Sequence, residues 1–395
     1  MHLFLEIGLT GAAVLVFVPC AVLFLEILAA ITQRANTIIC NAERRGLAVV
    51  IPAHNEETVI GETINSIVPQ LQSDDRLIVV ADNCTDKTAA IAVDAHAEVI
   101  MRSDLTRRGK GFALDFAMRH LEADPPDIVI VVDADCMVEA GAIDRLARFC
   151  TQTSRPVQAL NLSRAGQHAN LKMRVAEFAS AVKNHGRPLG LQRLGLPCQL
   201  TGTGMAFPWK CIRSAALANG HLAEDLKLGL DLARAGTPPV FCPEARVTSD
   251  FPTSARSVID QRTRWEHGHL NIILSEAPPM FLEAIRRTNL AMFALTLDLI
   301  VPPLALLTIL VVTIGCVSAS VYVLFGIRIP LLIATISAVL LALSVLLSWA
   351  RFGRRIISLG SLAIGAVYPL WKFPIYIRFL VARQLDWVKS KRRDD

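Results

Sequence analysis

Long hydrophobic runs frame the chain. Residues 3–31, 290–325 and 331–350 are almost free of charge. At about 1.5 Å per residue, each run can cross a hydrocarbon core of about 30 Å. A cleaved signal peptide is the alternative for the first run, but no Lys or Arg precedes it and it exceeds the usual apolar stretch of about 7–15 residues. The pattern predicts an N-terminal transmembrane helix and a C-terminal transmembrane hairpin.

A fourth apolar stretch, residues 356–380, is interrupted by prolines and charges, which suits an interfacial or re-entrant segment. The start of the first C-terminal span is also obscured, because Asp298 and the pair Pro302-Pro303 fall inside the run. Residues 281–299 are therefore alternatively predicted to lie along the membrane interface.

Between these runs the pattern changes. Short apolar runs at 47–51, 76–81 and 128–132 alternate with helix-like stretches at 58–71, 88–95 and 111–121. This alternation is typical of parallel strands joined by crossover helices, which bind ligands beyond the carboxyl ends of the strands. Four parts are expected: a transmembrane helix at 1–32, an α/β domain at 46–288, a transmembrane hairpin at 289–350, and an interfacial segment with a basic tail at 351–395.

Composition and charge support a soluble domain framed by membrane segments. The chain is 53% hydrophobic and 19% charged, too apolar for an ordinary soluble enzyme. No basic residue precedes the first run, and Arg34, Arg44 and Arg45 follow it, so the domain is expected in the cytoplasm. The basic residues after the hairpin and at the C-terminus are also expected there: Arg351, Arg354, Arg355, Lys389, Lys391, Arg392 and Arg393. We expect an integral protein of a bacterial inner membrane.

The cysteine content and the net charge indicate which ligands and partners to expect. Nine cysteines without a CxxC pair indicate reduced thiols rather than a disulfide frame or a zinc site. The net charge of +5 is spread along the chain, which does not suggest nucleic-acid binding and fits contact with membrane lipid better.

Two of the strand-like runs end in polar motifs, PAHNE at residues 52–56 and DNCTD at residues 82–86. Either motif alone fits helix capping equally well, because Asn, Asp and Thr are favoured caps. Together they predict a nucleotide pocket in which Asp82 accepts hydrogen bonds from a base or ribose.

The third strand-like run ends in Asp133-Ala134-Asp135. In an extended strand, alternate residues face the same side, so both carboxylates are expected to point together. Two hard oxygen ligands suit Mg²⁺ or Mn²⁺, which completes its shell with water and phosphate and would neutralise a diphosphate leaving group. A lone DxD tripeptide is weak evidence, but its place after two other strand-end motifs favours a divalent metal site.

Two later motifs each have a structural and a chemical interpretation. Glu224 and Asp225 precede an amphipathic stretch, where acids could stabilise a helix start or act as a general base on an acceptor hydroxyl. The QRTRW motif at residues 261–265 could be an amphipathic helix at the membrane. Alternatively, its arginines could clamp a diphosphate and its tryptophan could stack on a sugar.

The ordered set PAHNE, DNCTD, DAD, the ED of AED, and QRTRW resembles the family-two glycosyltransferases with a GT-A fold. The similarity is to their membrane branch in particular, which contains cellulose, hyaluronan and poly-N-acetylglucosamine synthases. It extends over the whole predicted α/β domain. The resemblance implies a Rossmann-like GT-A domain and a nucleotide-sugar donor.

Residue roles follow from the resemblance by position. Ala53, Glu56 and Asp82 would line the nucleotide pocket, and Asp133 and Asp135 would serve the diphosphate and the metal.

Other roles concern the acceptor side and the diphosphate. Asp225 would be the catalytic base, with Glu224 as the next candidate, and Lys110 of the RRGKG stretch would touch the nucleotide. The TGTG stretch at 201–204 resembles the acceptor loop, although turn-forming glycines explain it nearly as well. Three residues would close over diphosphate and acceptor: Gln261, Arg264 and Trp265.

The expected function is an inverting hexosyltransferase that moves a sugar from a UDP-hexose or UDP-N-acetylhexosamine to a lipid-linked or growing glycan. Surface or extracellular polysaccharide synthesis would be the setting, together with other assembly proteins. A processive synthase that secretes its own product is the second choice, because three spans are few to enclose a channel. The non-enzyme alternatives are a sugar-nucleotide-binding regulatory module and a transporter with a soluble appendage.

Overall fold

The computed structural model describes residues 2–32, 42–166, 169–251, 255–365 and 367–381, with the backbone alone at 255–258 and 260. Arg34 and the basic residues from Lys389 onward, which entered the orientation argument, lie outside these ranges. The chain forms two compact units. The helical unit comprises residues 1–35, 167–195 and 273–383, and the sheet unit comprises residues 36–166, 196–272 and 384–395.

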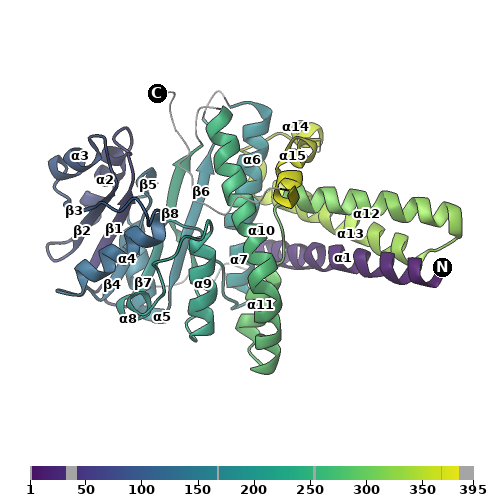
Figure 1. The fold of residues 1–395 in the computed structure, drawn as a ribbon, viewed down its shortest axis with the longest axis horizontal. Helices are drawn as coiled ribbons and strands as arrows, with labels where there is room; N and C mark the ends of the chain where they lie inside the picture. The colour runs from purple at the N-terminus through teal and green to yellow at the C-terminus, as the bar shows by residue number, and fades with distance from the viewer. Residues whose placement is uncertain (1, 33–41, 167–168, 252–254, 366, 382–395) are drawn as a thin grey trace. The chain divides into compact units, whose positions relative to one another are not determined.

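The sheet unit contains an eight-stranded mixed sheet in the order β3-β2-β1-β4-β7-β6-β8-β5 (Figure 1). Its first half is parallel, as the sequence predicts: β1 (Leu47–Ala53), β2 (Arg76–Asp82), β3 (Glu98–Arg102) and β4 (Ile128–Val131). The other strands are β5 (Cys136–Val138), β6 (Val157–Arg164), β7 (Met205–Pro208) and β8 (Val240–Asp250). Because β7 runs antiparallel to both β4 and β6, the sheet is mixed. Parallel pairing holds for the first half and returns only between β6 and β8.

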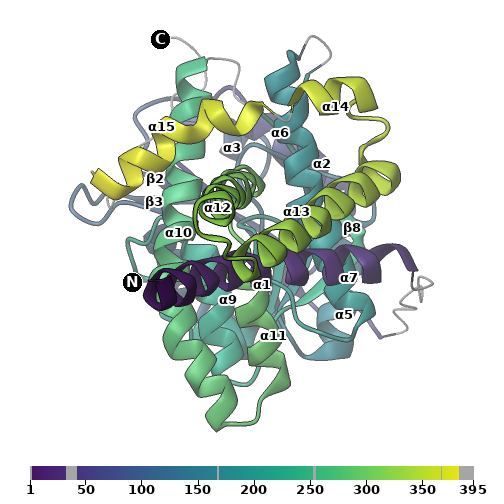
Figure 2. The ribbon, with the colours of Figure 1, turned by 90° about the vertical axis from the view of Figure 1, so that its right-hand side faces the viewer.

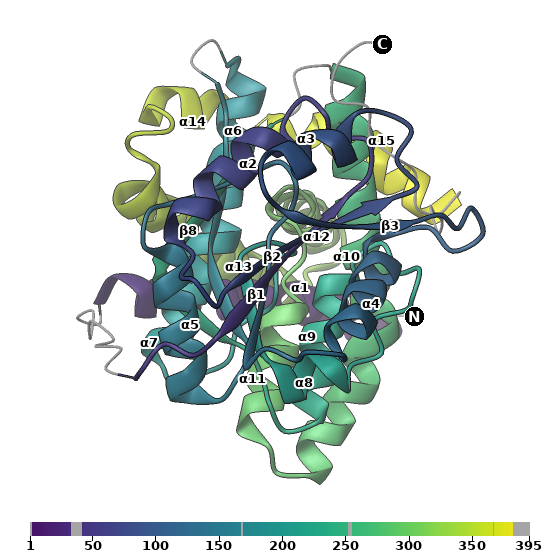
Figure 3. The same cartoon turned by 90° about the vertical axis from the view of Figure 1, so that its left-hand side faces the viewer.

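Helices cover both faces of this sheet. Val49 and Ile51 of β1 belong to one core, whereas Ala48 and Val50 belong to the other, because successive residues of a strand face opposite sides. The first core is covered by α2 (Ile60–Ile67), α3 (Thr88–Asp94) and α5 (Ala142–Thr153), and the second by α4 (Lys110–Leu121), α8 (Trp209–Arg213) and α9 (Glu224–Arg234). A short 3₁₀ turn at Val68–Gln70 follows α2. Figure 3 shows α2 and α4 on opposite sides of β1 and β2. The strand–helix alternation predicted from the sequence is confirmed.

The helical unit contains three helices that are long and apolar enough to cross a membrane: α1 (His2–Thr32), α12 (Leu304–Phe325) and α13 (Ile329–Ser348), the last continuing through a π turn at Trp349–Gly353. They lie side by side around Leu23, Leu307 and Leu341 (Figure 1). The apolar run at 290–325 forms two helices, α11 (Leu290–Leu299) and α12, so the candidate span begins after the proline pair that obscured its start in the sequence. Pro302 and Pro303 separate the two helices, since proline lacks the donor that a continuous helix needs.

Residues between β6 and β7 also belong to the helical unit. They form α6 (Leu171–Ala181), a π turn (Val182–Gly186) and α7 (Arg187–Arg193). Arg187 Nε donates to Glu26 Oε2 of α1 at 2.8 Å, and its Nη2 donates to the Asp298 carboxylate of α11; all three residues are buried. Gly190 packs on α1 so closely that a Cβ would lie 1.9 Å from the Glu26 carbonyl oxygen. This ionic cluster accounts for Asp298 inside an apolar run.

Three helices remain: α10 (Ala255–Arg286), which spans the boundary between the units, α14 (Leu359–Gly365) and α15 (Tyr368–Val381). Figures 1 and 2 show α15 lying crosswise at one end of the bundle formed by α1, α12 and α13, and its residues contact α12. The membrane depth of α15 and the domain boundaries inferred from sequence stay predictions.

Candidate active site

The Asp133-Ala134-Asp135 motif lies in a turn. Strand β4 ends at Val131, so the expectation that an extended strand orients the two carboxylates is wrong. The turn nevertheless gathers them: ligand atoms of Asp133, Asp135 and Cys136 lie within 4.8 Å of one another. The turn between β4 and β5 therefore brings the two carboxylates together, as the strand geometry was expected to do.

The donor atoms of this group fit a hard divalent cation. Cys136 is buried, and burial together with the Asp135 and Asp133 charges raises the pKa of its thiol well above the usual value. A protonated thiol is a poor ligand, whereas carboxylate oxygens are the ligands that Mg²⁺ and Mn²⁺ prefer. Asp133 and Asp135 are thus the residues of this group that could hold a metal.

Lys110, the first residue of α4, reaches into this acidic site. Its ammonium donates to Asp133 Oδ1 and to the carbonyl oxygen of Gly202. Burial lowers the pKa of this ammonium, but the carboxylates of Asp133 and Glu224 more than offset that effect, so the pKa lies above its usual value. Burial also raises the pKa of Asp133, against the opposing effect of Lys110. Lys110 was expected to touch the nucleotide; here it pairs with a carboxylate of the metal motif.

Gly202 brings the TGTG stretch into the same site. Its φ of +90° belongs to the left-handed region that favours glycine. A Cβ at this position would lie 3.4 Å from Asp225 Oδ2, 3.8 Å from Lys110 Nζ and 3.9 Å from Asp133 Oδ2. The residues predicted as base, metal ligand and nucleotide contact therefore meet around one glycine.

Glu224 and Asp225 form the first turn of α9. The N-cap of that helix is Ala223, and no side chain caps it, so the two acids do not act as cap residues. Both line a cavity with Lys110, Leu114, Met205 and Leu228. Burial, and then the neighbouring Asp225 charge, raise the pKa of Glu224 to about 7. The two acids thus face the same cavity, and Glu224 holds a proton more tightly there than an ordinary glutamate does.

The PAHNE and DNCTD motifs meet at the carboxyl ends of β1 and β2. A ring nitrogen of His54 lies 2.7 Å from the carbonyl oxygen of Asp82, and the backbone N–H of Glu56 donates to Thr88 Oγ1 at 2.8 Å. Ala53 is buried at the end of β1, opposite Ala81 in the ladder. The three residues predicted for the nucleotide pocket, Ala53, Glu56 and Asp82, therefore occupy one edge of the sheet.

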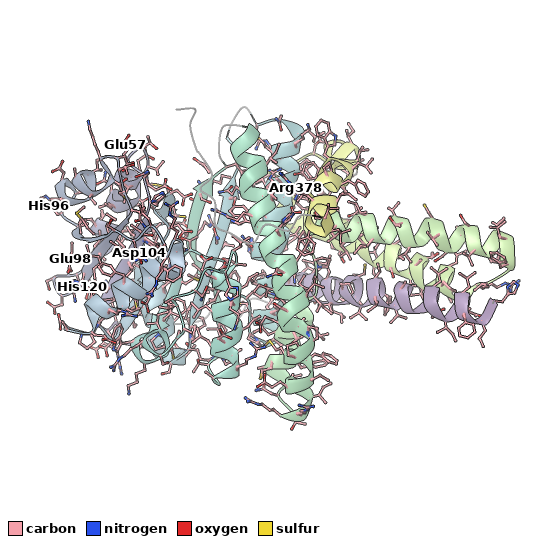
Figure 4. The ribbon with its side chains drawn as sticks, in the orientation of Figure 1. Glu57, His96, Glu98, Asp104, His120 and Arg378 are labelled. Atoms are coloured by element: carbon pink, nitrogen blue, oxygen red, sulfur yellow. The ribbon has the colours of Figure 1, made fainter. Side chains whose placement is uncertain are left out.

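The same edge holds two charged residues that sequence reasoning missed. Arg102 is the ladder partner of Asp82, and its Nη1 donates to Asp82 Oδ1 at 2.6 Å. Its Nη2 donates to Asp104 Oδ2 at 3.2 Å; Figure 4 labels Asp104. Burial raises the pKa of Asp82 although Arg102 opposes it. The available signal in the sequence was Arg102 itself, a basic residue at the end of β3.

A second charged group lies at the opposite ends of the strands. Arg76 begins β2 and Glu98 begins β3, and Arg76 Nη2 lies 3.0 Å from Glu98 Oε2. His120 also contacts Glu98, and both are labelled in Figure 4. Parallel sheets bind ligands at their carboxyl ends, so this group belongs to the fold rather than to the site.

The QRTRW residues lie on α10. Gln261 is buried, whereas Trp265 is 44% exposed. Three residues further along, Gly268 packs against the turn before Glu224: a Cβ there would lie 3.2 Å from Ala223 Cβ and from the carbonyl carbon of Leu222. The helix that carries Gln261, Arg264 and Trp265 is thus adjacent to the acid pair, and closure of these three side chains over a substrate stays a prediction.

Comparison with known proteins identifies the class. The family described as "Glycosyltransferase like family 2" matches residues 44–268, and the chain belongs to this family. It has the GT-A-like mixed α/β fold of a glycosyltransferase domain. The mannosyltransferase PcManGT of Pyrobaculum calidifontis has a similar fold, with a TM-score of 0.50 and 17% identity over 87% of this chain and 99% of that one.

Two curated relatives are similar in sequence. Glucosyl-3-phosphoglycerate synthase of Mycolicibacterium paratuberculosis is 42% identical over 97 residues, which is 23% of this chain and 29% of that protein. The protein called "Probable glycosyltransferase YdaM" of Bacillus subtilis is 26% identical over 254 residues, 58% of this chain and 56% of that protein. The alignments thus span less than a third of the first relative's length and about half of the second's.

Proposed function

We propose that the protein is a membrane-bound, inverting hexosyltransferase that moves a sugar from a UDP-hexose or UDP-N-acetylhexosamine to a lipid-linked or growing glycan. The setting we propose is surface or extracellular polysaccharide synthesis at the cytoplasmic face of a bacterial membrane. One observation carries the proposal: Lys110 Nζ, Asp133 Oδ2 and Asp225 Oδ2 all lie within 3.9 Å of the point where a Gly202 Cβ would be. The proposed base Asp225, the cation Lys110 and the proposed metal ligand Asp133 are thereby brought to one place.

The donor is proposed to bind between the two motif groups. Asp133 and Asp135 would hold Mg²⁺ or Mn²⁺, which when bound neutralises charge on the departing diphosphate. Asp82 and Arg102 offer one acceptor and several donors to a base or ribose. The mannosyltransferase of P. calidifontis was solved with GDP-mannose and Mn²⁺, which supports a metal-assisted donor here. Gln261, Arg264 and Trp265 would close over diphosphate and acceptor.

Transfer is proposed to proceed in one displacement. Asp225 takes the proton of an acceptor hydroxyl, the oxygen attacks the anomeric carbon, and the bond from that carbon to the diphosphate oxygen breaks. Attack from the face opposite the leaving group inverts the configuration, so an α-linked donor gives a β-linkage. Lys110 would remain a source of positive charge beside the diphosphate.

The acceptor is proposed to be at a membrane. The helices α1, α12 and α13 have the length and composition of transmembrane spans. The relative that makes glucosyl-3-phosphoglycerate is similar over 23% of this chain, so it supports the donor chemistry rather than its acceptor. A processive synthase is the second candidate. It would need a channel to secrete its polymer, and three spans are few to enclose a channel, whereas a transferase with a short product needs none.

The proposal is tested with the full-length protein in nanodiscs. UDP-, GDP- and dTDP-sugars are supplied with a membrane lipid extract, and released nucleotide is measured. We expect UDP release that depends on both acceptor and divalent metal, with a product of one or a few added sugars. Long polymer would favour the processive alternative, and no transfer from any UDP-sugar would contradict the proposal.

Topology is tested separately. A reporter fused after Asp395 should be cytoplasmic, and one fused before Leu3 should be outside. A C-terminal reporter accessible from outside would contradict the assigned number of spans.

A further inference from the structure

Helix α15 is apolar both where it is buried and where it is exposed. Pro369, Tyr376 and Phe379 lie on one face and are buried within the chain. The adjoining outer face is equally apolar but uncovered: Leu370 is 66% exposed, Phe373 48%, Ile377 43%, Leu380 73% and Val381 82%. A helix that met water on its outer side would carry polar residues there. An uncovered apolar face of this length indicates contact with another apolar phase.

The charges around this helix have one sign. Residues 349–381 contain no Asp or Glu and five basic residues: Arg351, Arg354, Arg355, Lys372 and Arg378. Four of them, Arg351, Arg354, Arg355 and Arg378, are exposed, and none of the four forms an ion pair within the described part of the chain. Figure 4 labels Arg378, on α15. The surface is therefore complementary to anions.

Aromatic rings contact Arg354 and Lys372 among these cations and also Lys172 of α6. The Lys172 ammonium lies 2.8 Å from the centroid of the Trp371 ring, and the Lys372 ammonium lies 5.6 Å from that of Tyr368. The Arg354 guanidinium lies 5.6 Å from the Trp349 centroid. Trp and Tyr paired with basic side chains are typical of the boundary between hydrocarbon and headgroups, where an apolar ring and a charge can each meet a suitable medium.

The position of these groups matches such a boundary. Arg351, Arg354 and Arg355 follow directly on α13, one of the helices that could cross a membrane. In Figure 2, α15 runs crosswise to α12, as a helix lying in the membrane plane would. The outward apolar face of α15 would then lie among acyl chains, with the cations at the level of phosphates.

We propose that Arg351, Arg354, Arg355, Lys372 and Arg378, here called the basic collar, bind the phosphates of anionic phospholipids while the outer face of α15 enters the hydrocarbon. The protein therefore selects anionic over zwitterionic lipid. This selectivity goes beyond sugar transfer and rests only on the proposed membrane spans, so it holds or fails independently of the reaction. The cations are screened by salt, and the preference should weaken as ionic strength rises.

The test uses full-length protein in neutral detergent with equal amounts of phosphatidylglycerol and phosphatidylcholine of the same acyl chains. Retained lipids are counted by native mass spectrometry. Because each basic residue near a membrane surface adds to the attraction for anionic lipid, we expect the wild type to retain phosphatidylglycerol in at least about fivefold excess. The Arg354→Gln/Arg355→Gln variant should fall to about twofold or less.

Two controls separate charge from position. Arg354→Lys/Arg355→Lys keeps both charges and should keep the preference. Arg328→Gln removes a charge in the turn between α12 and α13, at the other end of the hairpin, and should also keep it. If the double Gln variant fails to fold, Arg378→Gln provides the test and should lower the ratio. Equal retention of both lipids by the wild type, or an equal loss with Arg328→Gln, would overturn the proposal.

Discussion

The ammonium of Lys110 donates a hydrogen bond to Oδ1 of Asp133, so the DAD motif carries its own counter-ion. The same ammonium donates to the Gly202 carbonyl oxygen and thereby links α4, the turn after β4 and the TGTG stretch. A cation held among Asp133, Glu224 and Asp225 reduces their mutual repulsion. We therefore expect Lys110 both to stabilise the acidic site and to meet a diphosphate in the same position.

Replacing Lys110 with Met tests this double role. Asp133 would lose its charged partner beside Asp135, so we expect a lower melting temperature in chelator and donor binding weakened by about tenfold or more, the scale of a lost charge-assisted hydrogen bond. Added Mn²⁺ should restore the melting temperature of the variant more than it raises that of the wild type. Lys210→Met, an exposed position on α8, is the control. Unchanged donor affinity would contradict the assignment.

Chelation tests the metal. Because Asp133 and Asp135 offer the hard ligands of the site, EDTA should abolish transfer and Mg²⁺ or Mn²⁺ should restore it. Asp135→Ala should have the same effect without loss of folding. Cys136→Ala is the matched control: its thiol is buried and protonated, so metal-dependent transfer should persist. Full activity in chelator would show that the two carboxylates serve another purpose.

Strands β1, β2 and β4 could be predicted because they are buried on both faces and read as unbroken apolar runs, whereas β3 is only partly buried and was missed. The other half of the sheet, in which β7 reverses direction, could not be predicted. Strand β7 has only four residues, and its pairing with β4 depends on contacts distant in sequence. Likewise, the 290–325 run has the composition of one span, but two consecutive prolines divide it.

The site shows the same limit. Motif order predicted a set of site residues, and the structure brings Lys110, Asp133 and Asp225 of that set together; the roles of these residues stay predictions. Specific pairs were beyond the sequence: Asp82 meets Arg102 through the register of β2 and β3, and Lys110 meets Asp133 through the packing of α4. Arg187 was missed entirely, since only the folded helices bring it to Glu26 and Asp298.

Glu224 predicts a dependence of stability on pH. Its folded pKa of about 7 lies above the ordinary value of about 4.5, so the folded state binds the proton more tightly than the unfolded state. The stabilisation is complete below about pH 4.5 and is lost as pH rises through about 7. Glu224→Gln removes this dependence. We expect the melting temperature of the variant relative to wild type to rise between pH 5 and pH 8.

The comparison is made in the same detergent, with Glu244→Gln as the control, because Glu244 lies on β8, outside the acid pair. A difference between Glu224→Gln and wild type that is constant over this range would show that Glu224 does not titrate there.

The Arg187 cluster predicts a stability effect. Arg187→Ala would leave Glu26 and Asp298 buried without their cation, a change that typically costs about 3–5 kcal/mol. We expect a strongly lowered melting temperature in detergent. The triple variant Arg187→Met/Glu26→Gln/Asp298→Asn removes all three charges and should recover part of the loss. If Arg187→Ala melts like the wild type, the ionic cluster does not stabilise the helical unit.

We propose that Asp225 removes the acceptor proton, and the Asp225→Asn variant is the sharpest test of this role. Asparagine keeps the shape and hydrogen bonding of the side chain beside Gly202 but cannot accept the proton. Donor binding and melting temperature are measured beside the rate of sugar transfer. We expect the donor affinity and the melting temperature to stay near those of the wild type. The rate of sugar transfer should fall by at least about 100-fold, the scale of general-base catalysis. Near-normal transfer by Asp225→Asn would remove Asp225 from the mechanism and make Glu224 the next candidate.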